Sequence, residues 1–276
     1  MEPVITSLLD TDLYKYTMWQ TMLHRFPQTQ AEYSFVCRNQ PAYPLAELLP
    51  QVNAELDALC ALSFREDELA YIGGLRYIKS DFVDFLRIFR FQRNFIEARA
   101  EGAHLRIVAR GPQVHVMAFE IFVLAIVNEL YFRRFDRAAA EAEGRLRLQA
   151  KLDQLRALGN EAPLRHPFEL FDFGVRRRFS GAWQREVVQA FATQTAQWFK
   201  GTSNVLLARD FGIVPIGTMA HEYLQSYQAQ GVRLRDGWRR DLDRRQAQRD
   251  GHRDPLSLAE DRAPLAAFLA ARARRD

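Results

Sequence analysis

The sequence predicts an α/β protein, in which an α+β N-terminal domain precedes the first part of a parallel α/β barrel. Residues 1–160 mix helical and alternating strand patterns, whereas residues 161–236 place polar loops between short apolar strands and helix starts. The chain has 276 residues, 48% hydrophobic and 12% aromatic, so it can bury a substantial core. Residues 237–276 form a third segment, which is rich in arginine.

The first helix is predicted by apolar residues that recur at three- and four-residue steps: Leu13, Tyr16, Trp19, Leu23 and Phe26. An oxygen of Asp10, Thr11 or Asp12 would cap this helix by accepting free N–H groups of its first turn. Capping alone would explain these three residues without any catalytic or binding role. It does not explain Tyr14, which lies off the main apolar stripe beside Lys15.

The rest of the N-terminal domain alternates between the two patterns. Strands are predicted at residues 31–38, and in an antiparallel meander at 94–110 and 114–118 with turns at residues 101–102 and 111–112. Helical patterns cover residues 45–75, 82–91, 119–132 and 133–158, the last as a long amphipathic helix.

The second part has the order strand, helix, helix, strand, helix, which is typical of a parallel sheet or barrel. Its elements are a strand at 168–173, a helix at 181–199, a helix opened by residues 201–204, a strand end at 213–216 and a helix from 220. Polar loops follow at the points where strands end and helices start, and in barrels such loops face one common mouth.

Three polar loops carry the candidate chemistry, and each also has a plain structural interpretation. Arg176, in the segment FGVR, offers a planar fork to a carboxylate or phosphate, or is simply a solvent-facing arginine. The segment GTSN at 201–204 is a ligand loop or only a helix cap. His221 suits proton transfer or phosphoryl acceptance. Alternatively, it is a partly buried histidine inside a helix that Thr218 caps.

Other site classes find little support. Gln225 stands where a zinc-protease helix needs a second histidine, and Cys37 and Cys60 define neither a disulfide framework nor a metal site. The net charge is +4, but the arginines after residue 233 alternate with acids as on a solvated helix face, so nucleic-acid binding is only a weak alternative. The apolar run at 121–127 is too short to span a bilayer, and no signal peptide is visible, so a cytoplasmic protein without a membrane partner is expected.

Taken together, the segments LLDTDLYK, FDFGVRRRFS, FKGTSN and GTMAHEYLQ resemble the nicotinate phosphoribosyltransferase family, from about Ser7 to about Asp236. The resemblance implies a type II phosphoribosyltransferase-like fold and a homodimer. It also implies that nicotinate and phosphoribosyl pyrophosphate are joined to nicotinate mononucleotide and pyrophosphate, the entry step of NAD salvage. ATP and Mg²⁺ would be the co-substrate and its ion, with no tightly bound cofactor and no metal ligands assigned in this chain.

The resemblance also assigns residues. His221 matches a transiently phosphorylated histidine through which ATP hydrolysis is coupled to the transfer. Thr218 matches a threonine that contacts nicotinate. Phe173 and Tyr14 match aromatic residues that sandwich the pyridine ring, with Tyr14 coming from the other subunit of a dimer.

The remaining assigned positions concern the substrate's charged group. Gly174 and Arg176 are both assigned to substrate binding, and Arg176 matches an arginine of the related nicotinamide enzyme that contacts the substrate. Ser203 stands where the nicotinamide enzymes have an aspartate, which would repel a carboxylate, whereas a hydroxyl can donate to it. The acid nicotinate is therefore the expected substrate.

After Asp236 the likeness ends, and the family's acidic Asp-Ser-Gly-Asp segment and glycine-rich phosphate loops do not occur. We therefore expect a truncated or frame-shifted product that is weakly active or inactive. The alternatives are a genuine short variant with a helical C-terminus, and a non-catalytic homologue that binds a nicotinate-like ligand or a full-length partner.

Overall fold

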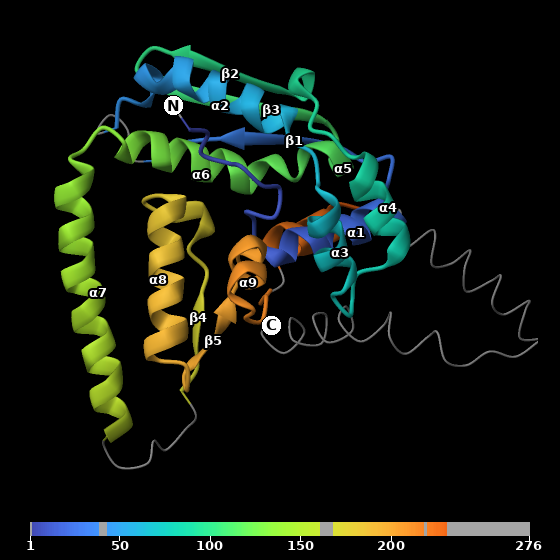
Figure 1. The fold of residues 1–276 in the computed structure, drawn as a ribbon. Helices are drawn as coiled ribbons and strands as arrows, with labels where there is room; N and C mark the ends of the chain where they lie inside the picture. The colour runs from blue at the N-terminus through green and yellow to red at the C-terminus, as the bar shows by residue number, and fades with distance from the viewer. Residues whose placement is uncertain (1, 39–42, 161–167, 218–219, 231–276) are drawn as a thin grey trace, which may run out of the picture. The chain divides into compact units, whose positions relative to one another are not determined.

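The computed structural model describes residues 2–38, 43–160, 168–217 and 220–230 (Figure 1). The chain divides into two compact units, residues 1–220 and residues 221–276. In the second unit, residues 221–230 form a helix. The expected Arg-rich segment at 237–276 lies outside the described residues, whereas the expected N-terminal domain and strand–helix part both contribute to the first unit.

The first unit contains a three-stranded antiparallel sheet with the order β1-β3-β2. Its strands are β1 (Gln30–Phe35), β2 (Ile96–Glu101) and β3 (His104–Pro112). In β3 the buried residues Leu105, Ile107 and Ala109 alternate with more exposed ones, as expected for a sheet with one face on the core. The expected antiparallel pairing within residues 94–110 is confirmed by β2 and β3, and the separately expected strand at 31–38 is present as β1.

Helix α6 (Phe119–Phe132) runs beneath this sheet (Figure 1). Most of its residues are apolar and nine of its residues are buried, while Glu120 and Asn128 lie on a partly exposed face. The segment Gln113–Phe132 is long and apolar enough to cross a membrane by length and composition, but 72% of it is buried inside the molecule. That burial fits the central helix of a core.

The strand expected at 114–118 is wrong, because residues Gln113–Val116 form helix α5. β1 begins at Gln30, which pairs with Pro112, so a strand continuing past Pro112 would have no partner. Instead the Gln113 N–H donates to the Thr29 carbonyl at 2.7 Å, and the chain turns into a helix that buries Val114 and Val116.

The helices before the sheet follow the predicted periodicity, except that the stretch at 45–75 is interrupted. It forms the 3-10 helix η1 (Leu45–Leu48), α2 (Leu49–Ala61) and α3 (Glu66–Gly73). α3 starts afresh because the Glu68 carboxylate accepts from the Arg65 N–H at 2.9 Å, which satisfies a free donor of its first turn.

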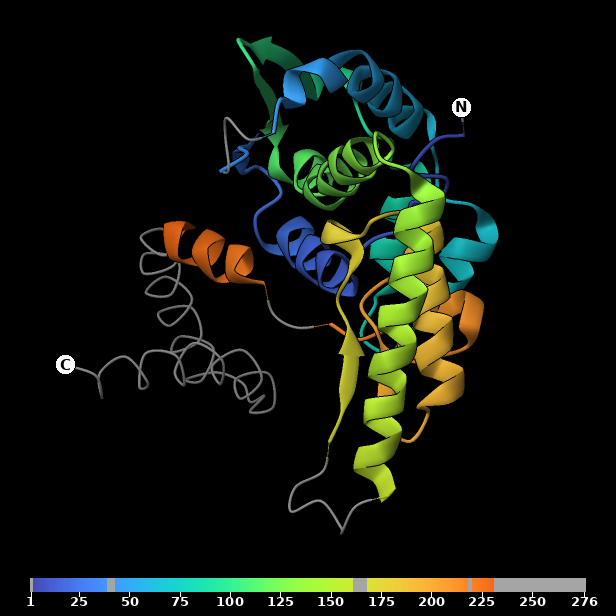
Figure 2. The ribbon, with the colours of Figure 1, turned by 90° about the vertical axis from the view of Figure 1, so that its left-hand side faces the viewer.

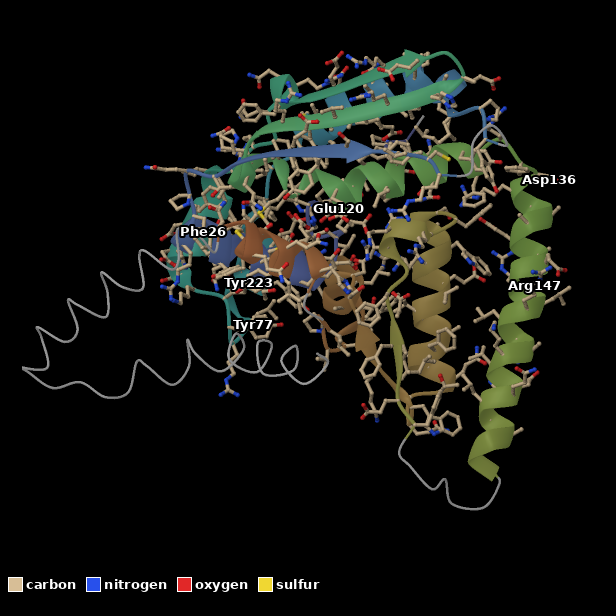
Figure 3. The ribbon with its side chains drawn as sticks, turned by 180° about the vertical axis from the view of Figure 1, so that it is seen from behind. Phe26, Tyr77, Glu120, Asp136, Arg147 and Tyr223 are labelled. Atoms are coloured by element: carbon tan, nitrogen blue, oxygen red, sulfur yellow. The ribbon has the colours of Figure 1, made fainter. Side chains whose placement is uncertain are left out.

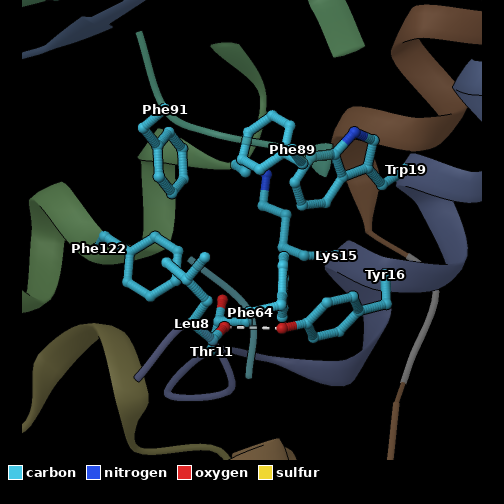
Figure 4. Close-up of a pocket in the computed structure, with 10 residues that line it drawn as sticks. Leu8, Thr11, Lys15, Tyr16, Trp19, Phe64, Phe89, Phe91 and Phe122 are labelled. Carbon is cyan, nitrogen blue, oxygen red and sulfur yellow. Dashed lines mark hydrogen bonds between the residues drawn. The ribbon is translucent and has the colours of Figure 1, made fainter. Parts of the chain in front are cut away.

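Helices α1 (Leu13–Arg25) and α4 (Ser80–Ile88) meet through aromatic side chains. Trp19 packs edge-on against Phe89, with ring centroids 4.5 Å apart. Figure 4 shows a small cavity nearby, which is lined mainly by aromatic rings. Apolar lining of this kind is part of the core.

Helix α7 (Arg137–Asn160) lies alongside α8 (Gly181–Gln194), as Figures 1 and 2 both show. Arg145 and Glu186 join the two helices, with Nε and Oε1 2.7 Å apart. The expected apolar face of α7 is only partly realised, because Leu152 is buried whereas Leu146 is 69% exposed.

The parallel part consists of β4 (Leu170–Asp172) and β5 (Phe199–Thr202), with α8 as the crossover between them. Thr202 forms a further parallel bridge with Pro215, so the chain after α9 (Val205–Phe211) adds a third position to this sheet. The α/β class is therefore confirmed. The order strand, helix, helix is corrected to strand, helix, strand, helix for residues 170–211, and the expected strand end at 213–216 forms a single bridge at Pro215.

The missed strand is β5. The predicted helix to residue 199 ends at Gln194, and residues 199–202, expected at the junction of two helices, are extended. Phe-Lys-Gly-Thr is short and mixed in polarity, so its periodicity gives no strand signal. Gly201 also has a φ of 152°, and a Cβ there would lie 2.1 Å from the Val214 carbonyl oxygen.

We expect Gly201→Ala to lower the free energy of unfolding by about 2–4 kcal/mol, because steric overlap adds to backbone strain. Gly212→Ala is the matched control, since Gly212 has a φ of 61° but no heavy atom within 4 Å of its Cβ position. Backbone strain alone costs about 1 kcal/mol there. Urea unfolding of both variants measures the difference. Equal losses would contradict the close approach.

Candidate functional site

The candidate site begins where the segment at 10–12 meets the segment at 202–204. Asp12 and Asn204 form an antiparallel bridge, and the Leu13 N–H donates to the Ser203 carbonyl at 2.8 Å. The Val205 N–H donates to the Thr11 carbonyl at 3.0 Å, which continues the pairing. Two motifs that are far apart in the sequence therefore lie side by side.

A buried ion pair holds this junction. Arg178 donates to both oxygens of the Asp10 carboxylate, from Nη1 at 2.6 Å and from Nη2 at 2.7 Å. Asn204 Nδ2 also donates to Asp10, at 2.8 Å, and all three residues are buried. Burial disfavours the Arg178 charge, but the Asp10 carboxylate outweighs that effect and raises the pKa of Arg178. The arginine is therefore structural.

Asp172 joins the end of β4 to the same junction. Its Oδ2 accepts from Thr202 Oγ1 at 2.6 Å and from Gln184 Nε2 at 2.9 Å, and its Oδ1 accepts from the Gly174 N–H at 3.0 Å. A Cβ on Gly174 would lie 2.9 Å from Asp172 Oδ1. Glycine at 174 therefore permits the carboxylate to approach, and the ends of both parallel strands are fixed together.

Asp12 occupies the N-cap position of α1, but its side chain makes no capping hydrogen bond. Its Oδ1 instead accepts from Ser203 Oγ at 2.6 Å, and its Oδ2 lies 3.9 Å from Arg176 Nε. Burial raises the pKa of Asp12, although the Ser203 hydrogen bond and the Arg176 charge oppose that shift. The capping interpretation of this acid is therefore wrong.

Arg176 belongs to the 3-10 helix η3 (Val175–Arg177), and its side chain remains 42% exposed. Its Cζ lies 5.9 Å from the ring centroid of Tyr14, within the range of cation–π attraction. Tyr14 is buried in a cluster with Ile121 and Val175. An exposed guanidinium on an aromatic face can bind a carboxylate attached to a planar ring.

The other expected residues belong to the third loop and to the end of β4. A Cβ on Gly217 would lie 3.4 Å from the Tyr14 nitrogen, so the third loop starts beside Tyr14. Thr218 lies outside the described residues, and His221 is an exposed residue that opens the helix of the second unit. Phe173 is 47% exposed at the end of β4.

Ser203 differs from its expected environment. It is 0% exposed, and its hydroxyl donates to Asp12. A direct bond from Ser203 to a nicotinate carboxylate stays a prediction, and it requires this hydroxyl to change partner.

Sequence reasoning missed the contribution of α6. Glu120 Oε1 accepts from Arg176 Nη1 at 3.2 Å, and Asn128 Nδ2 donates to the Arg176 carbonyl at 2.8 Å. The available signal was a carboxylate within a mostly apolar helix, since a carboxylate is rarely buried without a partner. Among the described residues, no group of three or more histidines, cysteines or acids could hold a metal ion.

Family models now place the chain. A model described as the nicotinate phosphoribosyltransferase (NAPRTase) N-terminal domain matches residues 9–128, and a model of the NAPRTase family matches residues 168–254. The chain belongs to the nicotinate phosphoribosyltransferase family. The second match extends past Asp236, where the motifs alone ended the resemblance.

Individual relatives agree with this family of enzymes. The nicotinate phosphoribosyltransferase of Herminiimonas arsenicoxydans is 63% identical over 236 residues, which are 86% of this chain and 59% of that protein. The nicotinate phosphoribosyltransferase of Chromobacterium violaceum is 57% identical over 236 residues, which are 85% of this chain and 59% of that protein. The chain therefore spans about three fifths of these relatives.

Solved structures give the same result. A crystal structure of nicotinate phosphoribosyltransferase from Vibrio cholerae is similar with a TM-score of 0.75 and 34% identity, over 82% of this chain and 54% of that one. The enzyme from Porphyromonas gingivalis has a TM-score of 0.70 and 32% identity, over 81% and 56% of the two chains. The fold of this family member is thus shared with known nicotinate phosphoribosyltransferases.

The environment of Asp12 predicts a pH-dependent effect of Asp12→Asn. A carboxyl whose folded pKa is raised stabilises the fold fully below its unfolded pKa, near 3.8, and loses that contribution as pH rises through the folded pKa. Asparagine is neutral throughout and still accepts from Ser203. The stability of the variant relative to the parent should therefore rise as the pH increases above about 4.

Urea unfolding of both proteins across this pH range measures the effect. A relative stability that stays constant, or falls with increasing pH, would show that Asp12 is not disfavoured as a charged group.

Proposed function

We propose that this chain provides the nicotinate-binding part of a nicotinate phosphoribosyltransferase. The reaction would join the ring nitrogen of nicotinate to C1 of phosphoribosyl pyrophosphate, with pyrophosphate as the leaving group. The observation that carries this proposal is the half-exposed Arg176 guanidinium against the Tyr14 ring, beside the start of the third loop.

The chemistry of Arg176 suits the acid rather than the amide. A guanidinium forms two charge-assisted hydrogen bonds with a carboxylate, whereas a neutral carboxamide offers a single acceptor oxygen. Phe173, which is exposed at the end of β4, would contribute a ring for stacking against the pyridine. A homodimer and a cytoplasmic location belong to the same proposal, whereas Tyr14 is taken here from the same chain as Arg176 and not, as expected from the resemblance, from the other subunit.

His221 would accept the γ-phosphoryl group of ATP on an imidazole nitrogen, releasing ADP. Water would later take the phosphoryl group, so that ATP hydrolysis drives the overall transfer. The exposure of His221 and its position at the start of the 221–230 helix support this role, because a helix N-terminus favours added negative charge. Mg²⁺ would accompany ATP, and Thr218 would contact nicotinate.

We expect Arg176→Gln to weaken nicotinate binding by about tenfold to a hundredfold, because one charge-assisted contact is lost. Nicotinamide binding should change much less. Arg177→Gln, at the neighbouring exposed position, is the matched control. Titration calorimetry measures all three. Equal nicotinate affinity in Arg176→Gln and Arg177→Gln would refute this placement of the substrate.

Incubation with ATP and Mg²⁺ should produce an acid-labile, base-stable phosphate on the chain, detectable by ³¹P NMR. His221→Asn should abolish it, whereas His104→Asn, at the exposed first residue of β3, should not. Nicotinate binding without phosphorylation or nicotinate mononucleotide formation would instead favour the non-catalytic homologue.

A further inference from the structure

Helix α6 contacts Arg176 at both ends of the residue. Glu120 Oε1 accepts from Arg176 Nη1 at 3.2 Å, while Asn128 Nδ2 donates to the Arg176 carbonyl at 2.8 Å. The two α6 residues are eight positions apart, or about 12 Å along the helix axis. A buried helix of the core therefore fixes both the backbone and the side chain of this arginine.

Glu120 is itself held firmly. It lies in the first turn of α6, where the helix dipole favours a carboxylate. Its second oxygen, Oε2, forms an ion pair with Lys15 Nζ, and that lysine is 2% exposed. Figure 3 shows Glu120 projecting from α6. Because Lys15 remains as a partner, Glu120 does not depend on Arg176 to keep its charge compensated.

Arg176 has a competing partner on its other side. Asp12 Oδ2 lies 3.9 Å from Arg176 Nε, and Asp12 is buried with Ser203. Without a carboxylate at position 120, the guanidinium would be drawn toward this buried acid and would gain rotamer freedom. Both changes would weaken ligand binding, because the free energy of binding would then include the cost of ordering the Arg176 side chain.

The geometry points to Glu120 as the positioning residue that holds the Arg176 guanidinium over the Tyr14 ring, ready to receive the carboxylate of a pyridine carboxylic acid. This inference rests on the proposed function for the identity of the ligand. The placement of Arg176 by Glu120 is independent of that identity. Glu120 would act through Arg176 and would not touch the substrate.

Two measurements on the full chain test this role. The Arg176 Nε–Hε NMR signal, assigned by its absence in Arg176→Gln, should shift in ligand-free Glu120→Gln. It should stay in place in Glu143→Gln, the control, whose exposed carboxylate pairs with Arg147. Nicotinate affinity should fall about three- to tenfold in Glu120→Gln, with less than about a twofold change for nicotinamide. In an Arg176→Gln background, Glu120→Gln should cause no further loss.

An unshifted Arg176 signal would overturn the inference, as would an equal loss of nicotinate affinity in the Arg176→Gln background, or tighter binding by Glu120→Gln. If Glu120→Gln does not fold, Glu120→Asp keeps a charge near Lys15 while withdrawing the carboxylate by one methylene, and the same outcomes apply. Wild-type nicotinate affinity in Arg176→Gln would instead refute the proposed substrate contact, while the NMR signal still decides the role of Glu120.

Discussion

The buried pairing of Arg178 with Asp10 is the interaction on which the arrangement of the site depends. Arg178 follows β4, Asp10 precedes α1, and Asn204, which also binds Asp10, caps α9. Neither charge is exposed, so removing one partner would leave the other uncompensated, at a cost of about 3–5 kcal/mol. Three segments that are distant in the sequence are thereby held together, and the other contacts of the site are built on this junction.

Two further carboxylates show how position determines role. Asp172 accepts three hydrogen bonds at the end of β4, and these bonds hold the ends of β4 and β5 together. Asp12 receives one close donor, Ser203, and faces Arg176 at a longer distance. Burial penalises the charge of Asp12, so it resists ionisation more than a surface aspartate would. A polar junction can thus contain one acid that fixes the fold and another that adjusts the electrostatics of the partly exposed Arg176.

The sequence predicted the class of the fold and the segments that meet, but not the separate contacts and roles of their side chains. Periodicity located α1 and α6 well, because both depend on apolar residues at helical spacing. It missed β5, whose four residues carry too little pattern, and it made a strand of α5, where two valines suggested alternation.

For the site, the motifs assigned Arg176 and Tyr14 to the same substrate, with Tyr14 from the other subunit, and the structure has the two residues in contact range within one chain. They could not place Ser203, because a hydroxyl that faces a ligand and one that faces a buried acid look alike in sequence. Nor could they identify Glu120, whose partners come from two other elements of the chain. Long-range pairing of charges is decided by tertiary packing, which local patterns do not contain.

The contacts of α6 with Arg176 have a consequence for how such proteins can be recombined. The strand–helix part carries three of the four recognisable motifs but not the charged groups around its own Arg176, since Glu120, Lys15 and Asp12 all precede residue 121. A chimera that joins the first half of one family member to the second half of another would need matching residues at these positions. The ligand preference of such a chimera should therefore depend on which two halves are combined, and not on either half alone.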